Sequence, residues 1–576
     1  MAVAAVAATL TAGCGRTEPA QPQAAAPAAS QPAAPAALPP PAVPLASLPK
    51  IDGAAILQTT TVMSSDKFQG RGPGTTGEEI TVGYLETQFR NLGLKPGNPD
   101  GTYIQKVPLV GITGSETRPL TFAKGSQTVP LKWKDEVVAW SRHVATAASM
   151  ANSDVVFVGY GVDAPEFNWN DFKDVDVTGK TLVVLVNDPP VPDPANGSGL
   201  DPKTFGGKAM TYYGRWTYKF EEGARKGAAA ILIVHETGPA GYPFSVVQGN
   251  LNEKFDLVAP DKNMGRANIE GWITLDAAKK LFAMGGQDYD ALKKQALTRD
   301  FKPVPLGVKA SMAVANKLRT IDSRNVIAKL EGSDPVLKDE YVVYSAHWDH
   351  LGVGAPVNGD TIYNGALDNA TGVATVLEIA KALKQAQPQP KRSFLFLMVT
   401  AEEKGLIGSE YYSLNPLYPL AKTVANINID GVNQWGRTKD ISVVGLGASE
   451  LDDYLLQAAQ EQGRTITADA EPEKGFYYRS DHFNFAKQGV PALDPDSGID
   501  YVGKSADWGK AKRDEYTDKD YHAPSDEVKA DWDLSGAVDD AQLLMAVGYR
   551  VANADRMPEW RAGNEFKAKR DAMMKK

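Results

Sequence analysis

The chain has 576 residues, too many for one compact core, so we expect two or three domains. Its hydrophobic content of 43% and charged content of 23% are close to the averages of soluble globular proteins. These values exclude wholesale disorder and a protein built from many membrane spans. The formal net charge of -9 gives no electrostatic reason to expect nucleic acid as a partner.

The first 14 residues are predicted to be an export signal. A short apolar run of small residues ends at Cys14, and polar residues follow at once. This run is too short to hold a mature protein across a bilayer. Its end, "LTAGC", resembles the lipobox of bacterial lipoproteins, in which the cysteine becomes the lipidated first residue. Because Cys14 is the only cysteine, we expect an exported lipoprotein of the cell envelope or periplasm, with a soluble secreted protein as the alternative.

Residues 15–49 are predicted to form an extended linker, because a composition of mostly Ala, Pro and Gln cannot bury a core. The pattern of apolar, polar and charged residues divides the rest of the chain into four parts. These are residues 50–150, an inserted region at 151–315, a main part at 316–560 and a charged tail at 561–576.

The inserted region and the main part differ in pattern. Short apolar stretches such as "SDVVFVGYG" and "KTLVVLVND" predict strands in the inserted region, where no cluster of histidines with carboxylates occurs. After Asn325, strands and helices alternate regularly, as in "DEYVVYSAH", "DNATGVATVLEIAKALKQ" and "KRSFLFLMVTAEE". Strands this apolar, separated by helices, predict an α/β fold with a mostly parallel sheet and helices on both faces.

Residues able to bind metal follow several of these strands. One strand reaches His347, another is followed by Glu402 and Glu403, and a third by Asp430, while Asp368 begins the helix after the first strand. Functional sites in such folds lie beyond the carboxyl ends of the strands. We therefore expect these side chains to converge on one edge of the sheet.

The ligand types narrow the choice of metal. Four of the six histidines lie in the main part with acidic residues nearby: His347, His350, His482 and His522. Imidazole and carboxylate ligands without thiolates suit zinc, and less often cobalt or manganese. The set could hold one ion, or two ions that share a carboxylate and activate a water. A pair of adjacent glutamates could supply one ligand and one base.

Five successive segments in this part resemble the motifs of the M28 family of zinc peptidases: "SAHWDHLG", "GALDNATGVATVLEIA", "TAEEKGLIGS", "NIDGVN" and "YHAPSD". The resemblance covers about Ile51 to Lys134 and Asn316 to Ala552. It implies two zinc ions bridged by Asp368. The other ligands would be His347 and Asp430 for one ion, and Glu403 and His522 for the second.

The resemblance also implies roles around the metals. Glu402 would be the general base, and Asp349 would orient His347. His522 in "YHAPSD" is preferred to His482 as a ligand. Tyr477 and Tyr521 are candidates for stabilising the tetrahedral oxyanion.

The inserted region resembles a protease-associated (PA) domain, from which no chemistry is expected. Together these features predict a zinc-dependent exopeptidase of peptide substrates, most simply an aminopeptidase. The alternatives are a carboxypeptidase or dipeptidase of the same family, for which Lys474 and Arg479 could bind a substrate carboxylate, a one-zinc glutaminyl cyclase, or an inactive receptor-like protein. We expect contact with a membrane only through a lipid attached to Cys14. The oligomeric state cannot be inferred from the sequence.

Overall fold

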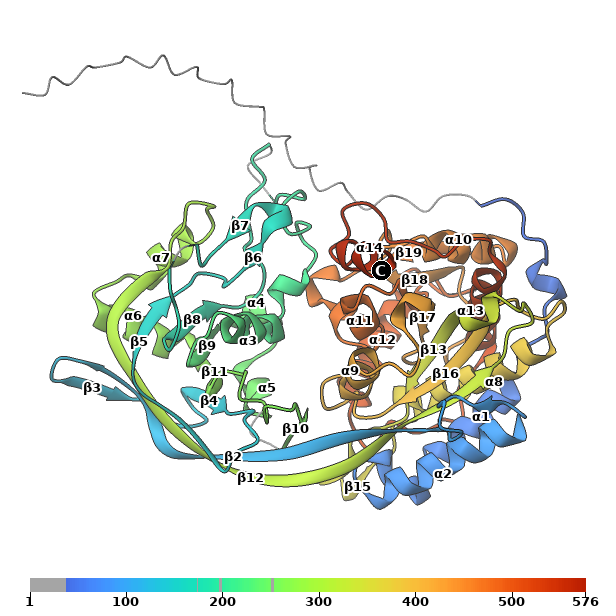
Figure 1. Cartoon of the computed structure of the whole chain (residues 1–576), viewed down its shortest axis with the longest axis horizontal. Coiled ribbons are helices and arrows are strands. Elements are labelled where there is room, and N and C mark those ends of the chain that lie inside the picture. The colour runs from blue at the N-terminus through green and yellow to red at the C-terminus, as the bar shows by residue number, and fades with distance from the viewer. Residues whose placement is uncertain (1–37, 174, 196–198, 250–252, 576) are drawn as a thin grey trace, which may run out of the picture.

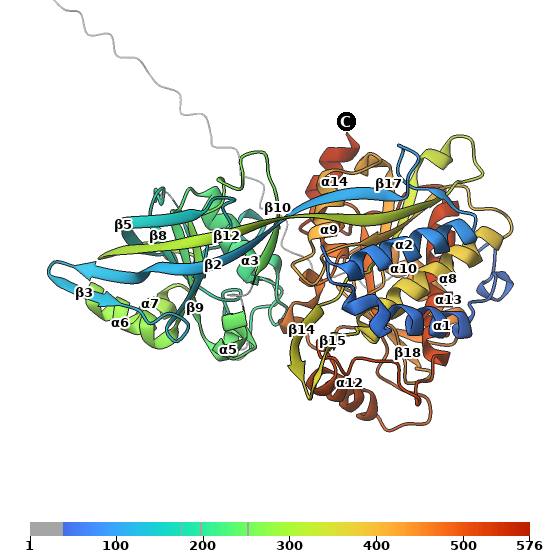
Figure 2. The ribbon, with the colours of Figure 1, turned by 90° about the horizontal axis from the view of Figure 1, so that it is seen from below.

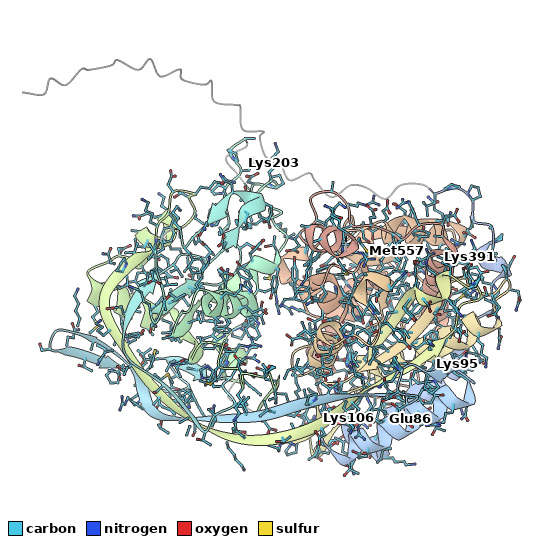
Figure 3. All side chains as sticks on the ribbon, viewed as in Figure 1. Glu86, Lys95, Lys106, Lys203, Lys391 and Met557 are labelled. Atoms are coloured by element: carbon cyan, nitrogen blue, oxygen red, sulfur yellow. The ribbon has the colours of Figure 1, made fainter. Side chains whose placement is uncertain are left out.

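The structure, a computed structural model, describes residues 38–173, 175–195, 199–249 and 253–575. These residues form a larger and a smaller lobe, which are joined by two long strands (Figure 1). Charged side chains such as Lys95 and Lys391 project from the surface of the larger lobe (Figure 3). The predicted signal segment and residues 15–37 of the predicted linker lie outside the described residues.

The larger lobe is built on a mixed, mostly parallel sheet with the strand order β19, β18, β20, β17, β13, β16, β12. Strand β13 runs parallel to β16 and β17, and β17 runs parallel to β20. Strand β12 is antiparallel to β16, and β18 is antiparallel to β20. The bounds are β12 (Val304–Leu330), β13 (Tyr341–His347), β16 (Ser393–Val399), β17 (Thr423–Asn428), β18 (Asp440–Val444), β19 (Thr465–Ala468) and β20 (Ala492–Ser497).

Helices cover both faces of this sheet, because successive side chains of each strand point to opposite sides. Val342 and Tyr344 of β13 lie in the core with one group of helices, whereas Val343 lies in a second core with Tyr412 and Phe485. The first group is α1 (Gly53–Met63), α2 (Thr76–Asn91), α8 (Thr371–Gln385), α10 (Leu451–Glu461) and α13 (Ser535–Asn553), and the second is α9 (Ile407–Leu414) and α11 (His482–Lys487). The predicted α/β fold is confirmed.

The smaller lobe has its own apolar cores on a sheet that continues the same hydrogen-bonded path. Strands β5, β8, β9 and β11 are parallel neighbours, and β4 pairs antiparallel with β11. The bounds are β3 (Gln127–Pro130), β4 (Val137–Trp140), β5 (Ala147–Phe157), β8 (Thr181–Leu185), β9 (Ala230–His235), β11 (Ile269–Thr274), α3 (Trp216–Arg225), α5 (Phe244–Gln248), α6 (Leu275–Gly285) and α7 (Tyr289–Gln295).

Strands β2 (Ile104–Lys124) and β12 connect the lobes as one antiparallel ribbon (Figures 1 and 2). Their register runs from Ile104 opposite Val326 to Ala123 opposite Lys309. The predicted boundary between residues 150 and 151 falls inside β5, and β3 and β4 before it already belong to the smaller lobe. The structure thus places the start of this lobe earlier than expected, within the long strand β2.

Both ends of the described chain pack against the larger lobe. Leu45 and Leu48, within the predicted linker, are buried in its core, and the N–H of Leu45 donates to Glu461. The predicted charged tail contains helix α14 (Lys567–Met574), whose buried Arg570 donates to the carbonyl oxygens of Leu420 and Thr423. Apolar spacing alone did not reveal these contacts. Within the described residues, no helix has the length and apolar character needed to cross a membrane.

Candidate metal centre

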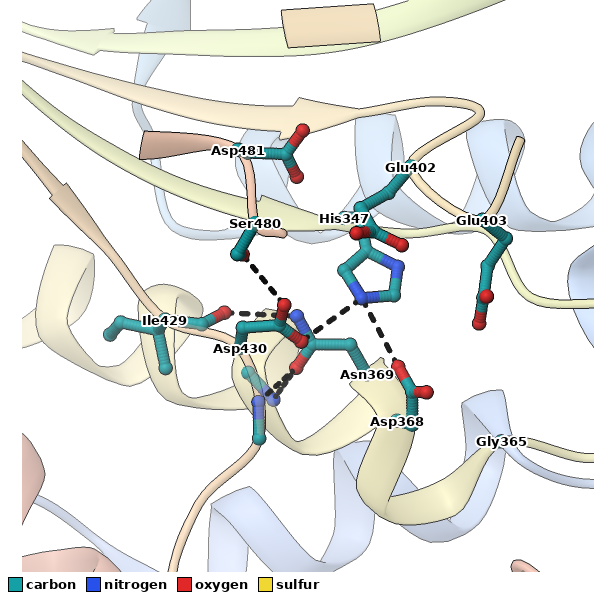
Figure 4. A network of polar contacts seen from close by, with 12 residues as sticks. His347, Gly365, Asp368, Asn369, Glu402, Glu403, Ile429, Asp430, Ser480 and Asp481 are labelled. Atoms are coloured by element: carbon teal, nitrogen blue, oxygen red, sulfur yellow. Dashed lines mark hydrogen bonds and ion pairs between the residues drawn. The ribbon is translucent and has the colours of Figure 1, made fainter. Parts of the chain in front are cut away.

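The predicted ligands meet at the carboxyl ends of three adjacent parallel strands. His347 ends β13 and lies opposite Val399, which ends β16 and precedes Glu402 and Glu403. On the other side, β17 ends at Asn428, two residues before Asp430. Asp368 approaches from the turn before α8 (Figure 4). The pairing of the strands therefore brings residues from four distant segments together.

Two groups of ligand atoms share Asp368. His347 Nε2 lies 3.2 Å from Asp368 Oδ1 and 3.1 Å from Asp430 Oδ1. His522 Nε2 lies 3.2 Å from Asp368 Oδ2 and 3.1 Å from Glu403 Oε2. Each carboxylate oxygen of Asp368 thus faces a different histidine, as expected for a carboxylate that bridges two ions.

His350 joins the second group, although the resemblance to M28 peptidases implied no role for it. Its Nδ1 lies 2.6 Å from Glu403 Oε1, and His350, Asp368 and Glu403 offer ligand atoms within 4.8 Å of one another. Both of these close atoms are buried, and within the described residues each faces only the other. The available signal was the short spacing in "HWDH", which places a second imidazole three residues after His347.

Glu402 lies beside the proposed ligands with a carboxylate that is free in the described part of the chain. Among the described residues its carboxylate makes no hydrogen bond or ion pair. Burial, with the charges of Glu403 and Asp430, raises the pKa of Glu402 well above its ordinary value, against the opposing effect of His347. Ala401 just before it has a left-handed backbone, with φ of 54°, a conformation that concentrates at functional sites.

Asp349 was expected to orient His347, and the contact that it makes with this histidine is through its backbone. His347 Nδ1 is 3.0 Å from the backbone oxygen of Asp349 but 3.8 Å from its carboxylate Oδ1. That carboxylate oxygen instead accepts a hydrogen bond of 3.0 Å from the N–H of Glu402. Asp349 therefore orients the first histidine through its main chain and the glutamate segment through its side chain.

Hydrogen bonds around the ligands hold them in place. Ser480 donates to Asp430 Oδ2 at 2.6 Å, and its own oxygen accepts from Asn428 at 2.7 Å. On the opposite side, the carboxylate of Asp526 accepts from the N–H groups of Leu367 and Asp368, each at 3.1 Å. Such outer partners fix the orientation of metal ligands.

Arg71 is fully buried, and within the described part of the chain its guanidinium donates only to backbone oxygens. It donates to Trp348 at 2.9 Å, Asn364 at 2.6 Å and Gly365 at 2.7 Å, and also to Met63 and, at 3.5 Å, to Asp368. Burial lowers its pKa to about 10, against the nearby negative charges, so it stays charged at neutral pH. One cation thus joins the loops that carry His347 and Asp368.

The two tyrosines that were candidates for stabilising the oxyanion lie in different surroundings. The ring of Tyr521 stacks on His522, with centroids 3.8 Å apart, and is 48% exposed. The ring contacts of Tyr477 in the described chain are with Tyr478, His482 and Phe566, and its hydroxyl is buried without a hydrogen-bond partner. Tyr521 therefore contacts the proposed ligand His522, whereas Tyr477 packs against other aromatic rings and His482.

The electrostatics of the cluster suit a cationic metal. Burial disfavours the charged imidazole of His522, but Glu403 and Asp368 outweigh it and raise the pKa to about 10. Burial and the charge of Asp368 likewise oppose ionisation of Glu403, yet His350 and His522 lower its pKa to about 2. Imidazole nitrogens and carboxylate oxygens converge here without thiolates, which is the donor set of a zinc centre.

Residues 325–546 match the family model described as Peptidase family M28. This segment is an M28 peptidase domain. The M28 segment contains His347, Asp368, Glu402, Glu403 and Asp430, and it also contains His522.

Parts of the chain are similar to known proteins. It is 30% identical over 208 residues to leupeptin-inactivating enzyme 1 of Streptomyces exfoliatus, covering 35% of this chain and 43% of that protein. It is 35% identical over 131 residues to aminopeptidase NAALADL1 of Mus musculus, covering 22% and 16%. The chain thus spans less than half the length of these relatives. A solved aminopeptidase from Aneurinibacillus sp. strain AM-1 aligns over 89% of this chain and 96% of its own, with 17% identity and a TM-score of 0.47.

Proposed function

We propose that this protein is a zinc-dependent exopeptidase, an aminopeptidase that removes N-terminal residues from peptides. The observation that carries this proposal is the Asp368 carboxylate, shared between two ligand groups with the unpaired Glu402 beside them. His347 and Asp430 would complete one zinc site, and Glu403 and His522 the other. The M28 match and the aminopeptidase names of several relatives support the reaction class.

Zinc bound between these groups would acidify a water and polarise the scissile carbonyl. The role of the protein's own side chains is then to transfer one proton. Glu402 takes a proton from the attacking water on its carboxylate and returns it to the nitrogen of the leaving amine. Its freedom from other partners leaves both oxygens available for this transfer.

Tyr521 is the better placed of the two tyrosines for stabilising the oxyanion. Although half of the side chain is exposed, its partial burial, with the charges of Asp368 and Glu403, raises the pKa of the hydroxyl above the ordinary value. The group therefore remains a hydrogen-bond donor at neutral pH. A donor aimed at the carbonyl oxygen stabilises the charge that develops there. Tyr477 is not proposed for this role, because its hydroxyl is buried and its ring packs against Tyr478 and Phe566.

The alternative functions would require a different number of zinc ions or a different set of ligands. A glutaminyl cyclase would use one zinc, whereas two ligand groups favour two. A receptor-like relative would have lost ligands or the base, and none is missing here. We further propose export with lipidation at Cys14, and a PA-like identity for the smaller lobe, on the sequence patterns alone.

The test is zinc per purified chain by elemental analysis, combined with hydrolysis of aminoacyl p-nitroanilides before and after chelation. We expect close to two zincs and activity that is lost on chelation and regained with zinc. One zinc or none, with no hydrolysis after zinc is restored, would contradict the proposal.

A further inference from the structure

A short strand of the smaller lobe lies beside the segment that carries Glu402. Strand β10 (Lys254–Leu257) falls between α5 and β11 in the sequence, but it pairs antiparallel with β2, with Phe255 opposite Gly111. It lies between the two lobes (Figures 1 and 2) and contacts α9, the helix that follows the two glutamates. Strand β10 therefore links the smaller lobe to the segment after β16.

The two faces of β10 make different contacts, because side chains alternate along a strand. On one face, Lys254 lies over the ring of Trp140 at 4.1 Å. The buried carboxylate of Asp256, on the same face, accepts a hydrogen bond of 3.0 Å from Arg142. Both contacts hold β10 to the smaller lobe, since Trp140 ends β4 and Arg142 follows it.

Phe255, on the opposite face, shares an apolar core with the base loop, which we define as residues 400–406. Phe255 is 5% exposed, and Ala401 of the loop is fully buried. The ring of Phe255 lies 5.9 Å from Nζ of Lys404, another residue of the loop. The buried members of this core are Val107, Leu109, Phe255, Ile321, Ala401 and Ile407. The core thus includes apolar residues that flank Glu402 and Glu403 on both sides.

The backbone of the base loop forms a tight turn. The N–H of Ile407 donates to the carbonyl oxygen of Ala401 at 3.1 Å, and the N–H of Leu406 donates to that of Glu402 at 2.9 Å. Ala401 and Leu406 have left-handed backbones, with φ of 54° and 61°. Such conformations persist only where the surrounding structure holds them. The apolar core around Phe255 holds this turn at Ala401 and Ile407.

We propose that Phe255 is a positioning residue for Glu402, because it fills the apolar core that holds the base loop in its turn. This inference rests on the proposed exopeptidase function and gives the smaller lobe, which supplies none of the proposed ligands, a part in catalysis. Removal of the ring would leave a cavity into which the turn can shift. A displacement of about 1 Å at a catalytic group can lower the rate about 100-fold.

The experiment measures hydrolysis of alanine p-nitroanilide by the zinc-loaded full chain and its variants. We expect kcat of Phe255→Ala to fall about 10- to 100-fold with little change in KM, because the base is displaced while substrate binding is kept. Phe255→Leu, which keeps a large apolar side chain, should recover most of the rate. Phe282 is the matched control, since this phenylalanine is fully buried in the smaller lobe's own core. Phe282→Ala and Phe282→Leu should lower the melting temperature but keep kcat.

A double-mutant cycle with Glu402→Gln separates positioning of the base from a general loss of stability. When Glu402 is already replaced, Phe255→Ala should lower the remaining rate little, because the group that it positions is gone. A role limited to stability would lower the rate by the same factor in both backgrounds. Melting temperature checks folding, and if the alanine variants do not fold, the two leucine variants carry the comparison of kcat.

Elemental analysis should give the same zinc content in the Phe255 variants as in the wild type. Three results would overturn the inference and leave the exopeptidase function standing: an unchanged kcat, equal losses at Phe255 and Phe282, or a loss of zinc in proportion to activity. No hydrolysis by the zinc-loaded wild type would overturn the exopeptidase function, and the inference with it.

Discussion

The carboxylate of Asp349 accepts a hydrogen bond of 3.0 Å from the backbone N–H of Glu402. Both residues flank the proposed ligands, since Asp349 follows His347 by two positions and Glu402 precedes Glu403. The contact fixes the loop after β16 against the loop after β13. The position of Glu402, the proposed base, therefore depends on the side chain of Asp349.

Asp349→Ala should lower kcat about 10- to 100-fold, the range seen when outer partners of metal sites are removed. The N–H of Glu402 would lose its acceptor. Asp349→Asn should recover much of the rate, because its amide oxygen can accept the same hydrogen bond. Steady-state kinetics with zinc content measured in parallel would show this. Equal loss in both variants would mean that the charge, rather than the hydrogen bond, matters.

Glu402→Gln should retain both zincs and lose about 100- to 10,000-fold in kcat, as expected for loss of a general base. The amide of glutamine cannot accept the proton of the water. Glu331→Gln, which alters a surface ion pair with Lys95, is the control and should behave like the wild type. A fully active Glu402→Gln enzyme would refute the assignment.

Asp368→Asn should reduce zinc to at most one per chain, because one of the two carboxylate oxygens becomes an amide. Elemental analysis after dialysis against a weak chelator measures this directly. Asp154→Asn, at an exposed ion pair with Lys309, should keep the wild-type metal content. An unchanged zinc content in Asp368→Asn would remove the bridging role.

Arg71→Met should lower the free energy of unfolding by about 3–5 kcal/mol, because it leaves several buried carbonyl oxygens without a donor. It should also weaken zinc binding, since the loops of His347 and Asp368 lose their common contact. Arg90→Met, at an exposed pair with Glu86, should cost about 0.5 kcal/mol. Denaturant unfolding with and without zinc compares the two. Similar losses for both arginines would show that Arg71 has no special structural role.

Zinc binding to the metal-free protein should release protons. With a pKa of about 10, His522 is protonated at pH 8, whereas a zinc ligand must be neutral. Zinc affinity should therefore rise with pH until the pH passes the raised pKa, after which this residue releases none. Calorimetric titration at pH 8 in buffers of different ionisation enthalpy counts the protons. An enthalpy independent of the buffer would contradict the expectation.

The sequence predicted much of the site because its residues follow regular elements. His347 ends one apolar strand and Asp430 follows another, and the parallel pairing of these strands is enough to bring them together. Arg71 could not be found in this way, since "GRG" looks like an ordinary loop and its role depends on carbonyl groups almost 300 residues away.

The ribbon of β2 and β12 limits how the two lobes can move. The strands are hydrogen-bonded to each other in both lobes and across the junction, so no single flexible residue separates them. Reorientation of the smaller lobe would have to spread over many residues as a change in strand twist. The relative position of the lobes is therefore governed by the elasticity of a sheet and not by a hinge.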